Sequence, residues 1–372
     1  MAFNQRPIRV LLLTKHTRRG ASSRMRFLQF LSPLEKRGFV FDECPFFSDE
    51  AHLDKRYEKG GIGRSAVIKA YLGRFRALCQ VRRHDVVWLQ AEALPYLPSW
   101  ADSLLSIQGR PIVVDYDDAI FHQYDSANSK LIRKVLGGKI KSIMRTVDTV
   151  VVGNSYLGEY ASRAGADRII EIPTVIDASR YESVPRTHSA SPVIGWIGTP
   201  VTAKFVRKII PALENVMEKT GAGVTLIGAG DEISDAFKTH KPNIVEWSEK
   251  TETEELAKID LGLMPLNLTK FDLGKCGYKL IQYMASGAAV LATDSPANRA
   301  IVNRSHSGRI LPEAASPAEW SNVIVEMLAD RRALKKMGES GRIATKEVYS
   351  LNAQVERVEN LLRAAAQRST RL

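Results

Sequence analysis

The stretch that decides the fold reads Phe271-Asp-Leu-Gly-Lys-Cys-Gly-Tyr-Lys-Leu-Ile-Gln-Tyr-Met-Ala-Ser-Gly287. It lies between two apolar runs, residues 259–266 and 288–293, which have the length and composition of buried strands. Gly274 and Gly277 mark a loop after the first run, and roughly ten residues of helical periodicity follow. The sequence therefore predicts a strand, a glycine-containing loop, a helix capped by Gly287 and a second strand.

The loop and the helix start bring two lysines together with several backbone N–H groups. Lys275 and Lys279 flank Gly277 at the predicted helix N-terminus, where a positive charge opposes the helix dipole. Two interpretations follow. Either the lysines and the N–H groups bind a phosphate or diphosphate, or the lysines are solvated side chains on a loop. The spacing alone does not decide between them.

Length and composition bound the class of protein. The chain has 372 residues, which predicts two domains. Its hydrophobic content of 44% and charged content of 25% are those of a soluble globular protein, and its apolar runs are too short to span a bilayer. The N-terminus has no signal-peptide pattern. Cys44, Cys79 and Cys276 are widely spaced, so we expect no disulfide framework, no zinc site and a cytoplasmic location.

The formal net charge of +12 is concentrated in the first half of the chain. Such an excess is typical of proteins that meet nucleic acid, anionic lipid or an anionic substrate. Aromatic residues do not interleave with the basic patches as they do in RNA-binding modules, so we predict no nucleic-acid partner. Residues 62–83 and 130–145 read as basic amphipathic helices. They are either solvated outer helices of a sheet or helices that lie on an anionic membrane surface, here the inner face of the membrane.

The first half opens with a β-α unit. A buried strand is predicted over residues 8–13 and a loop over 14–23, and a helix is expected to begin at Ser22 or Ser23. The loop lies at the carboxyl edge of a parallel sheet, where α/β proteins bind ligands. Arg24 and Arg26 fall in the first turn of this helix, as ligand-binding residues or as ordinary surface residues.

Three carboxylates follow another predicted strand, residues 111–115. They are Asp115, Asp117 and Asp118, with His122 close behind. We consider three interpretations: a metal site of the DxD type, an active-site cluster of acids that binds sugar hydroxyls, or a turn with a helix N-cap. No further clustered ligands accompany the acids. For His122 we favour an ordinary hydrogen-bonded loop residue over a catalytic one.

Two sets of alternating strands and helices are separated by residues 174–192, which lose periodicity and are rich in Pro, Ser and Thr. We predict an N-terminal domain over 1–180, a linker over 181–192, a C-terminal domain over 193–345 and a C-terminal helix over 346–372. The predicted class is α/β, with two Rossmann-like domains facing across a cleft and the C-terminal helix packing back on the N-terminal domain. Neither the dinucleotide fingerprint G-x-G-x-x-G nor a P-loop is present.

Several motifs point to a family. They read Arg19-Gly-Ala-Ser-Ser-Arg-Met-Arg26, Asn154-Ser155, Ile172-Pro-Thr-Val-Ile-Asp177, Gly195-Trp-Ile-Gly-Thr-Pro-Val-Thr-Ala-Lys204, Leu226-Ile-Gly-Ala-Gly230, Asp260-Leu-Gly-Leu-Met-Pro265 and the opening stretch with its following strand. In these motifs the sequence resembles the GT-B glycosyltransferases, and among them the retaining family 4 type, also called glycosyl transferases group 1. The resemblance covers nearly the whole chain.

This resemblance implies a hexosyltransferase that moves a sugar from a nucleotide-sugar donor to a glycan or lipid-linked acceptor in surface polysaccharide or glycolipid synthesis. It implies retention of configuration and neither a metal nor a cofactor. The donor-binding positions that it assigns are Gly198, Thr199, Thr202, Gly228, Trp247, Gly277, Tyr278, Lys279 and Gln282. Lys204 matches the family's diphosphate-binding lysine. Gln282 and Gly274 stand where the family has two glutamates.

The expected chemistry follows from these positions. A departing diphosphate needs cations and helix N–H groups near its developing charge. We assign this role to Lys204 and Lys275, and we expect Asp117 and Asp115 to orient the acceptor or a sugar hydroxyl. Arg24, Arg26 and Asp118 are expected to bind the acceptor. The missing glutamates leave two alternatives open, a weak or inactive nucleotide-sugar binding protein and a GT-B epimerase.

Overall fold

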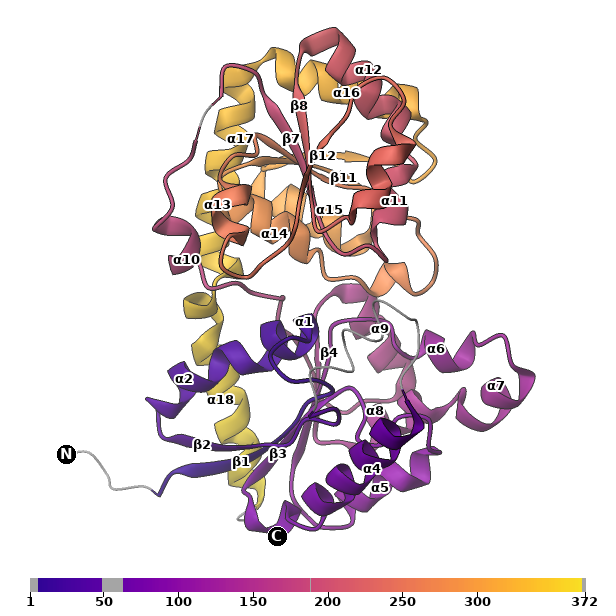
Figure 1. Ribbon diagram of the computed structural model, residues 1–372. Coiled ribbons are helices and arrows are strands. Elements are labelled where there is room, and N and C mark those ends of the chain that lie inside the picture. The colour runs from indigo at the N-terminus through magenta and orange to yellow at the C-terminus, as the bar shows by residue number, and fades with distance from the viewer. Residues whose placement is uncertain (1–5, 49–62, 188, 370–372) are drawn as a thin grey trace, which may run out of the picture. The chain divides into compact units, whose positions relative to one another are not determined.

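The computed structural model describes residues 6–48, 63–187 and 189–369, and the chain divides into two compact units. Unit 1 comprises Met1–Thr174, Gly274–Cys276 and Gln354–Leu372, and unit 2 comprises Val175–Leu273 and Gly277–Ala353. Each unit is a parallel sheet covered by helices (Figure 1). No helix within the described residues is long and apolar enough to cross a membrane.

The sheet of unit 1 has six parallel strands in the order β2-β1-β3-β4-β5-β6. Its strands are β1 (Ile8–Leu13), β2 (Phe39–Glu43), β3 (Val86–Gln90), β4 (Ile112–Tyr116), β5 (Thr149–Val152) and β6 (Ile169–Glu171). The central strands are almost wholly buried because helices lie on both faces of the sheet. The strand order reverses between β1 and β3, and the carboxyl ends of the strands at such a reversal are where open α/β sheets typically bind ligands.

The helices of unit 1 include the end of the chain. They are α1 (Ala21–Ser23), a π-helix (Arg24–Leu28), α2 (Gln29–Glu35), α4 (Arg64–Leu78), a short 3-10 helix (Val81–Arg83), α5 (Ser99–Ser106), α6 (His122–Asp125), α7 (Lys130–Leu136), α8 (Lys139–Thr146), α9 (Ser155–Ala164) and α18 (Leu351–Ser369). From Gln354 onward α18 belongs to unit 1. Glu359 pairs there with Arg37, and Arg357 donates to the carbonyl of Glu171. The C-terminal helix therefore packs on the N-terminal unit, as the sequence predicted.

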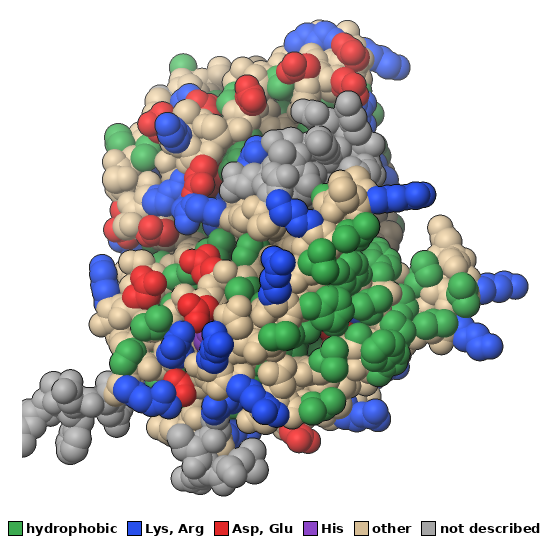
Figure 2. All heavy atoms as spheres, turned by 60° about the horizontal axis from the view of Figure 1, so that its bottom comes forward, with side chains coloured by type: hydrophobic (Ala, Val, Ile, Leu, Met, Phe, Trp, Pro, Cys, Tyr) green, Lys and Arg blue, Asp and Glu red, His purple; other side chains and the backbone are tan. Residues whose placement is uncertain are grey.

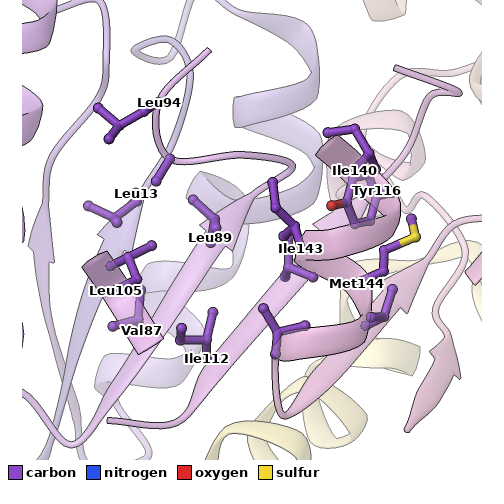
Figure 3. Packing of buried hydrophobic residues seen from close by; sticks show 14 of the residues in the cluster. Leu13, Val87, Leu89, Leu94, Leu105, Ile112, Tyr116, Ile140, Ile143 and Met144 are labelled. Atoms are coloured by element: carbon purple, nitrogen blue, oxygen red, sulfur yellow. The ribbon is translucent and has the colours of Figure 1, made fainter. Parts of the chain in front are cut away.

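A hydrophobic core fills the space between this sheet and the helices α5 and α8. Figure 3 shows Leu105 of α5 and Ile143 and Met144 of α8 lying against strand residues such as Leu89 and Ile112. One charged residue enters the same region. Lys139, which the sequence placed on a basic amphipathic helix, is 0% exposed and pairs with Glu92 at 2.7 Å and with Asp102 at 3.2 Å. The expectation of a solvent-facing lysine was wrong at this position.

The sheet of unit 2 has six parallel strands in the order β12-β11-β10-β7-β8-β9. Its strands are β7 (Val193–Ile197), β8 (Gly223–Ile227), β9 (Asn243–Val245), β10 (Leu261–Met264), β11 (Ala289–Thr293) and β12 (Gly308–Leu311). This is the doubly wound Rossmann order, which reverses between β7 and β10. The carboxyl ends of β7 and β10 are therefore where a ligand is expected.

Helices cover this second sheet as well. They are α10 (Ser179–Glu182), α11 (Ala203–Arg207), α12 (Ile210–Thr220), a 3-10 helix (Asp231–Ala236), α13 (Glu252–Leu256), α14 (Tyr278–Ala285), α15 (Pro296–Ser305), α16 (Pro317–Ala329), α17 (Arg331–Ala344) and a π-helix (Thr345–Tyr349). A further 3-10 turn spans Asp272–Gly274. Helix α14 is the one predicted in the opening stretch, and Gly287 follows its last turn at a φ of 75°. The N–H groups of Gly287 and Ala288 bond to the carbonyls of Met284 and Tyr283, so Gly287 ends the helix as predicted.

The segment predicted as a linker, residues 181–192, is part of unit 2. Tyr181 is 5% exposed, and Arg186 donates to the carbonyls of Ser286 at 2.9 Å and Ile259 at 2.8 Å. Arg186 also lies 3.3 Å from the carboxylate of Asp260. Residues 181–187 are thus held in place by side-chain contacts that no local sequence pattern predicts.

Candidate functional site

The centre of the candidate site is the carboxyl edge of the second sheet. Strands β7 and β10 pair only at Ile194 with Leu261 and at Gly195 with Gly262, and they separate beyond these pairs. The buried phenol of Tyr283 fills the space between them. Its hydroxyl accepts from the N–H of Ile197 at 2.9 Å and donates to the carbonyl of Leu263 at 3.1 Å. Tyr283 therefore fixes α14 against both strands at the point where the strand order reverses.

A tight turn follows β7. The Thr202 hydroxyl accepts from the N–H of Thr199 and donates to the Thr199 carbonyl, both at 3.0 Å. Gly228, after β8, has a φ of 71°, and a Cβ there would lie 2.4 Å from the Gly198 carbonyl oxygen. The loops after β7 and β8 therefore touch backbone to backbone. The structure brings the predicted donor-binding residues of these two loops together.

The first turn of α14 reaches the same edge. Gly277 stands at the N-cap with a φ of 67°, and no side chain of the described residues caps this end of the helix. Within this first turn, the ammonium group of Lys279 lies 4.8 Å from the ring centroid of Trp196, the residue two before Gly198. Lys204 is exposed on α11, with its ammonium group 5.2 Å from the ring of Phe205. Two of the predicted cations, Lys279 and Lys204, thus belong to elements that begin at this sheet edge.

A buried polar network lies behind the edge. Glu252 is 3% exposed and accepts from the indole N–H of Trp247 at 2.7 Å and from the Tyr181 hydroxyl at 3.0 Å. Gln282 is also 3% exposed and hydrogen bonds with Tyr181. The sequence predicted Gln282 as a ribose-binding residue, and the structure places its side chain in the interior. Sequence reasoning missed Glu252, because a glutamate in the acidic run 252–255 reads as part of a solvated helix.

The segment Gly274–Cys276 packs within unit 1. The Asn154 side-chain amide donates to the carbonyls of Gly274 at 2.9 Å and Lys275 at 3.2 Å, and the Cys276 thiol lies 3.1 Å from the carbonyl oxygen of Asp117. A Cβ at Gly274 would come within 2.4 Å of the backbone nitrogen of Ala119. Gly274 therefore leaves no room for a side chain, because the backbone of this loop lies directly on the loop after β4.

The three acids after β4 differ in burial: Asp115 is buried, and Asp117 and Asp118 are half-buried. Asp115 is 4% exposed and forms a bidentate ion pair with Arg26 at 2.8 and 2.9 Å, and Arg26 also donates to the carbonyl of Ile172 at 2.8 Å. Burial raises the pKa of Asp115 to about 6, and the Arg26 guanidinium opposes that rise. Arg26 and Asp115 are thus bound to each other in the interior. The structure does not present either of them to an acceptor, because each charge is taken up by the other.

Asp117 and Asp118 are half-buried, and their carboxylates are not part of that pair. Within the described residues no side chain bonds to the Asp117 carboxylate. His122 is held on both sides, by Asp125 at 2.7 Å and by the Tyr156 hydroxyl at 2.8 Å, which agrees with the structural interpretation of this histidine. Asp117 is therefore the member of the cluster that is placed to bind a ligand.

The helix with the two arginines begins earlier than predicted. Its N-cap is Gly20, and Ser23 instead accepts from the N–H of His16 at 3.1 Å and donates to the side-chain oxygen of Gln90 at 2.8 Å. Arg24 is 7% exposed and donates to the Arg18 carbonyl at 3.1 Å. Ser23 was expected to cap the helix. It ties the loop after β1 to the end of β3, because a hydroxyl inside the sheet edge needs partners there.

No group of three or more His, Cys, Asp or Glu side chains suited to a metal ion occurs in the described part of the chain. The DxD interpretation would have needed Asp115 and Asp117 to share a cation. In the structure Asp115 already has a guanidinium as its counterion. Residues 115–117 therefore do not form a paired carboxylate site.

Comparisons with known proteins agree with this architecture. Residues 191–330 match the family model described as glycosyl transferases group 1. Sucrose-phosphate synthase from Thermosynechococcus elongatus superposes with a TM-score of 0.71 at 14% identity, over 96% of this chain and 98% of that one. HepE of Anabaena, solved with UDP and glucose, superposes with a TM-score of 0.70 at 12% identity, over 96% of this chain and 100% of that one. WaaG, a glycosyltransferase involved in lipopolysaccharide biosynthesis, superposes with a TM-score of 0.65 at 15% identity, over 95% of this chain and 99% of that one.

No curated protein sequence matches the chain. The structural likenesses, at identities of 12–15%, establish the fold, which is that of the GT-B glycosyltransferases. The family match covers most of unit 2 and includes the loops after β7 and β8 and the whole of α14. Residues 191–330 thus match the glycosyl transferases group 1 family, and the whole chain has the fold of the GT-B glycosyltransferases.

Proposed function

We propose that this protein transfers a hexosyl group from a nucleotide-sugar donor to a hydroxyl of a glycan or lipid-linked acceptor, with retention of configuration and without a metal ion. The observation that carries the proposal is the edge of β7 and β10 in unit 2, where the Thr199–Thr202 turn, Gly228 and the first turn of α14 converge. A diphosphate fits such a place, because a helix N-terminus and nearby cations favour negative charge. HepE of Anabaena was solved in complex with UDP, which supports the same chemistry.

The residues of this edge would stabilise the diphosphate as it leaves the sugar. As the anomeric bond to the diphosphate breaks, negative charge grows on the departing phosphate oxygens. Lys279 and Lys204, together with the N–H groups of Gly277 and Tyr278, would stabilise that charge. Lysine and backbone donors at a preorganised site meet this need without a metal, and we propose that the enzyme needs none.

Asp117 has a separate role in this proposal. Its carboxylate is half-buried and unbonded within the described residues, so it can accept a hydrogen bond from an acceptor or sugar hydroxyl. Asp118 and Arg24 would assist in binding the acceptor. Asp115 and Arg26 contribute indirectly, because their ion pair holds the strand end from which Asp117 projects.

The cellular setting is a separate part of the proposal. WaaG is involved in lipopolysaccharide biosynthesis, which supports a surface polysaccharide or glycolipid as the product here. Cys44, Cys79 and Cys276 are free thiols, which supports a reducing compartment. We therefore propose that the enzyme works in the cytoplasm, where nucleotide-sugar donors would meet a lipid-linked acceptor.

A thermal-shift screen with UDP-, GDP- and dTDP-sugars tests the donor class, since a ligand that binds the native state raises its melting temperature. Lys279→Ala should remove most of the shift caused by the best nucleotide-sugar. Lys270→Ala, an exposed lysine in the preceding loop, is the matched control and should keep it. Donor turnover that persists in excess EDTA agrees with metal independence. Turnover that disappears with EDTA and returns with a divalent cation contradicts it.

One observation favours a second candidate, a nucleotide-sugar binding protein with weak or no transfer activity. A side chain at Gly274 would collide with Ala119, so an acid cannot stand there to contact the sugar. Incubation of the pure protein with its best donor, with and without acceptors, separates the outcomes. Transfer or donor hydrolysis indicates an active enzyme, and a new sugar isomer from the donor alone indicates an epimerase. Tight binding with no product indicates a binding protein.

A further inference from the structure

Three helices of unit 1 carry large apolar side chains that point into solvent. On α4 these are Ile68, Leu72 and Phe75, which are 61%, 56% and 41% exposed. On α5 they are Trp100, Leu104 and Ile107, which are 69%, 40% and 74% exposed. Both sets follow the spacing i, i+4, i+7, which places each set on one face of its helix. Leu131 and Val135 repeat the i, i+4 spacing on α7, at 70% and 52%.

These outward faces are additional to the faces that build the core. On α4 the core contacts come from Ala77 and Leu78, and on α5 from Ala101 and Leu105. Each helix is therefore apolar on two sides, one against the sheet and one toward solvent. A soluble helix needs only the first. Exposing the outward apolar side chains to water is unfavourable in free energy, so a patch of them indicates a surface that binds a partner.

The three helices present these side chains on one side of the unit. The side-chain amide of Gln108, just after α5, donates to the Leu78 carbonyl at the end of α4 at 2.8 Å, and Tyr71 of α4 hydrogen bonds with the Pro95 carbonyl before α5. Figure 2 shows hydrophobic side chains gathered into one broad area of this part of the surface, with basic side chains at its margins. We call the outward side chains of α4, α5 and α7 the apolar face.

The exposed charges on the described segments that carry α4 and α7 have one sign. Residues 64–83 and 126–147 contain no Asp or Glu. The acid of α5, Asp102, is 6% exposed and pairs with buried Lys139. The exposed basic residues of these segments are Arg64, Lys69, Arg76, Arg82, Arg83, Lys130, Arg133, Lys134, Lys141 and Arg145. Among the described residues of these two segments, the exposed charged side chains are therefore all cations.

We propose that the apolar face is a docking surface for an anionic phospholipid bilayer. Aliphatic and aromatic side chains that enter the headgroup region, with Lys and Arg at their margin, are how an interfacial helix binds anionic lipid. Trp100 and Tyr96, 69% and 60% exposed, are of the types that favour the membrane–water interface. A two-fold dimer through this face would instead bring two cationic margins together, because an isologous interface joins like to like. This proposal does not rest on the proposed function.

Vesicle flotation of the full chain tests the proposal directly. We expect the protein to float with vesicles of equimolar phosphatidylglycerol and phosphatidylcholine and to bind pure phosphatidylcholine far less. Trp100→Ser with Ile107→Ser should weaken binding about tenfold or more, because it removes the apolar area of two strongly exposed side chains. The control is Val40→Ser with Ile343→Ser, two exposed apolar residues outside α4, α5 and α7. That variant should bind as the parent does.

The cationic margin has its own variant. Lys130→Gln, Arg133→Gln and Lys134→Gln together should weaken binding to the anionic vesicles about tenfold or more, and added salt should reduce the difference from the parent. Lys219→Gln, Arg332→Gln and Lys336→Gln remove the same charge from exposed positions of unit 2 and should have little effect. Circular dichroism of each variant confirms that it folds.

Tryptophan fluorescence gives a readout at the face itself. Trp100 is the most exposed of the five tryptophans, and Trp88, Trp196 and Trp320 are buried. Anionic vesicles should shift the emission to shorter wavelength, and Trp100→Phe should lose that shift while it still floats. Three results would overturn the proposal. They are no flotation of the parent, equal flotation of the face and control variants, and a dimer in solution that Trp100→Ser with Ile107→Ser converts to a monomer.

Discussion

The ring of Tyr283 on α14 lies directly on Gly262 of β10. A Cβ built on Gly262 would come 2.2 Å from the ring, which no real contact allows. The close approach lets the Tyr283 hydroxyl reach between the diverging strands and bond to both Ile197 and Leu263. The helix whose first turn carries Tyr278 and Lys279 is therefore positioned by a glycine on a neighbouring strand.

Removing the Tyr283 hydroxyl should destabilise the protein. Tyr283→Phe leaves the buried N–H of Ile197 without its acceptor, which should lower the free energy of unfolding by about 1–3 kcal/mol. Tyr160→Phe is the matched control, because the buried Tyr160 hydroxyl has no hydrogen-bond partner among the described residues. We expect that variant to be neutral or slightly stabilised. Urea unfolding of both variants measures the difference, and equal stabilities would contradict the bridging role of Tyr283.

Lys139 should be essential for the stability of unit 1. Lys139→Met leaves the buried carboxylates of Glu92 and Asp102 without their cation, and breaking a buried ion pair costs about 3–5 kcal/mol. Lys134→Met, an exposed residue of the neighbouring helix α7, should change the free energy of unfolding by less than about 0.5 kcal/mol. Thermal or urea unfolding distinguishes them. A mild effect of Lys139→Met would mean that this charge is solvated.

Asp115 and Asp117 should respond in opposite ways to loss of charge. Asp115→Ala strands the Arg26 guanidinium in the interior and should cost about 3–5 kcal/mol of stability. Asp117→Asn keeps the size of the side chain at a half-buried position, so stability should change little while donor turnover falls by about tenfold or more.

The comparison of these two variants needs both unfolding curves and turnover measured at a temperature where each is folded. Asp115→Ala is expected to lose activity as it unfolds, at a lower temperature than the parent. If Asp117→Asn keeps full turnover, its carboxylate has no role in the reaction.

Gly274 should tolerate no side chain. Gly274→Ala places a Cβ 2.4 Å from the backbone nitrogen of Ala119, and relief of such a clash costs about 1–3 kcal/mol. Gly138→Ala is the control, since a Cβ at Gly138 meets nothing within 4 Å and the φ there is −94°. Differential scanning calorimetry of the two variants is the measurement. A melting temperature for Gly274→Ala that equals the parent's would show that this loop can move away from Ala119.

Much of the fold could be predicted from local patterns. The alternation of apolar strands and amphipathic helices is visible over a few residues, so the α/β class and both parallel sheets followed from it. The opening stretch was predicted with its loop, its helix and the ending at Gly287, because a helix cap depends on residues adjacent in the chain. Strand β12 was not predicted, since its four residues include Gly308 and Arg309 and show no apolar run.

The candidate site was predicted only in part. The features that depend on residues close together in the chain were predicted, and those that depend on distant partners were not. The resemblance assigned Gly198 and Gly228 to one donor site, and the structure brings the loops after β7 and β8 together, because the carboxyl ends of adjacent parallel strands share one edge. Sequence reasoning did not reveal that Gln282 points inward to Tyr181, or that Glu252 joins them. The amphipathic pattern of α14 does not say which polar residue faces the interior, since that depends on a partner about 100 residues away.

The sequence by itself determined the order of elements, the class of the fold and the stretch that contributes α14 to the carboxyl edge of the unit 2 sheet. All of these depend on the spacing of residues along one segment. Only the tertiary structure decided that Arg26 neutralises Asp115, 89 positions away, and that Lys139 lies between Glu92 and Asp102. From the sequence alone, a charged side chain is expected to face solvent, because its counterion cannot be identified. Long-range packing is what brings the two charges together in the interior.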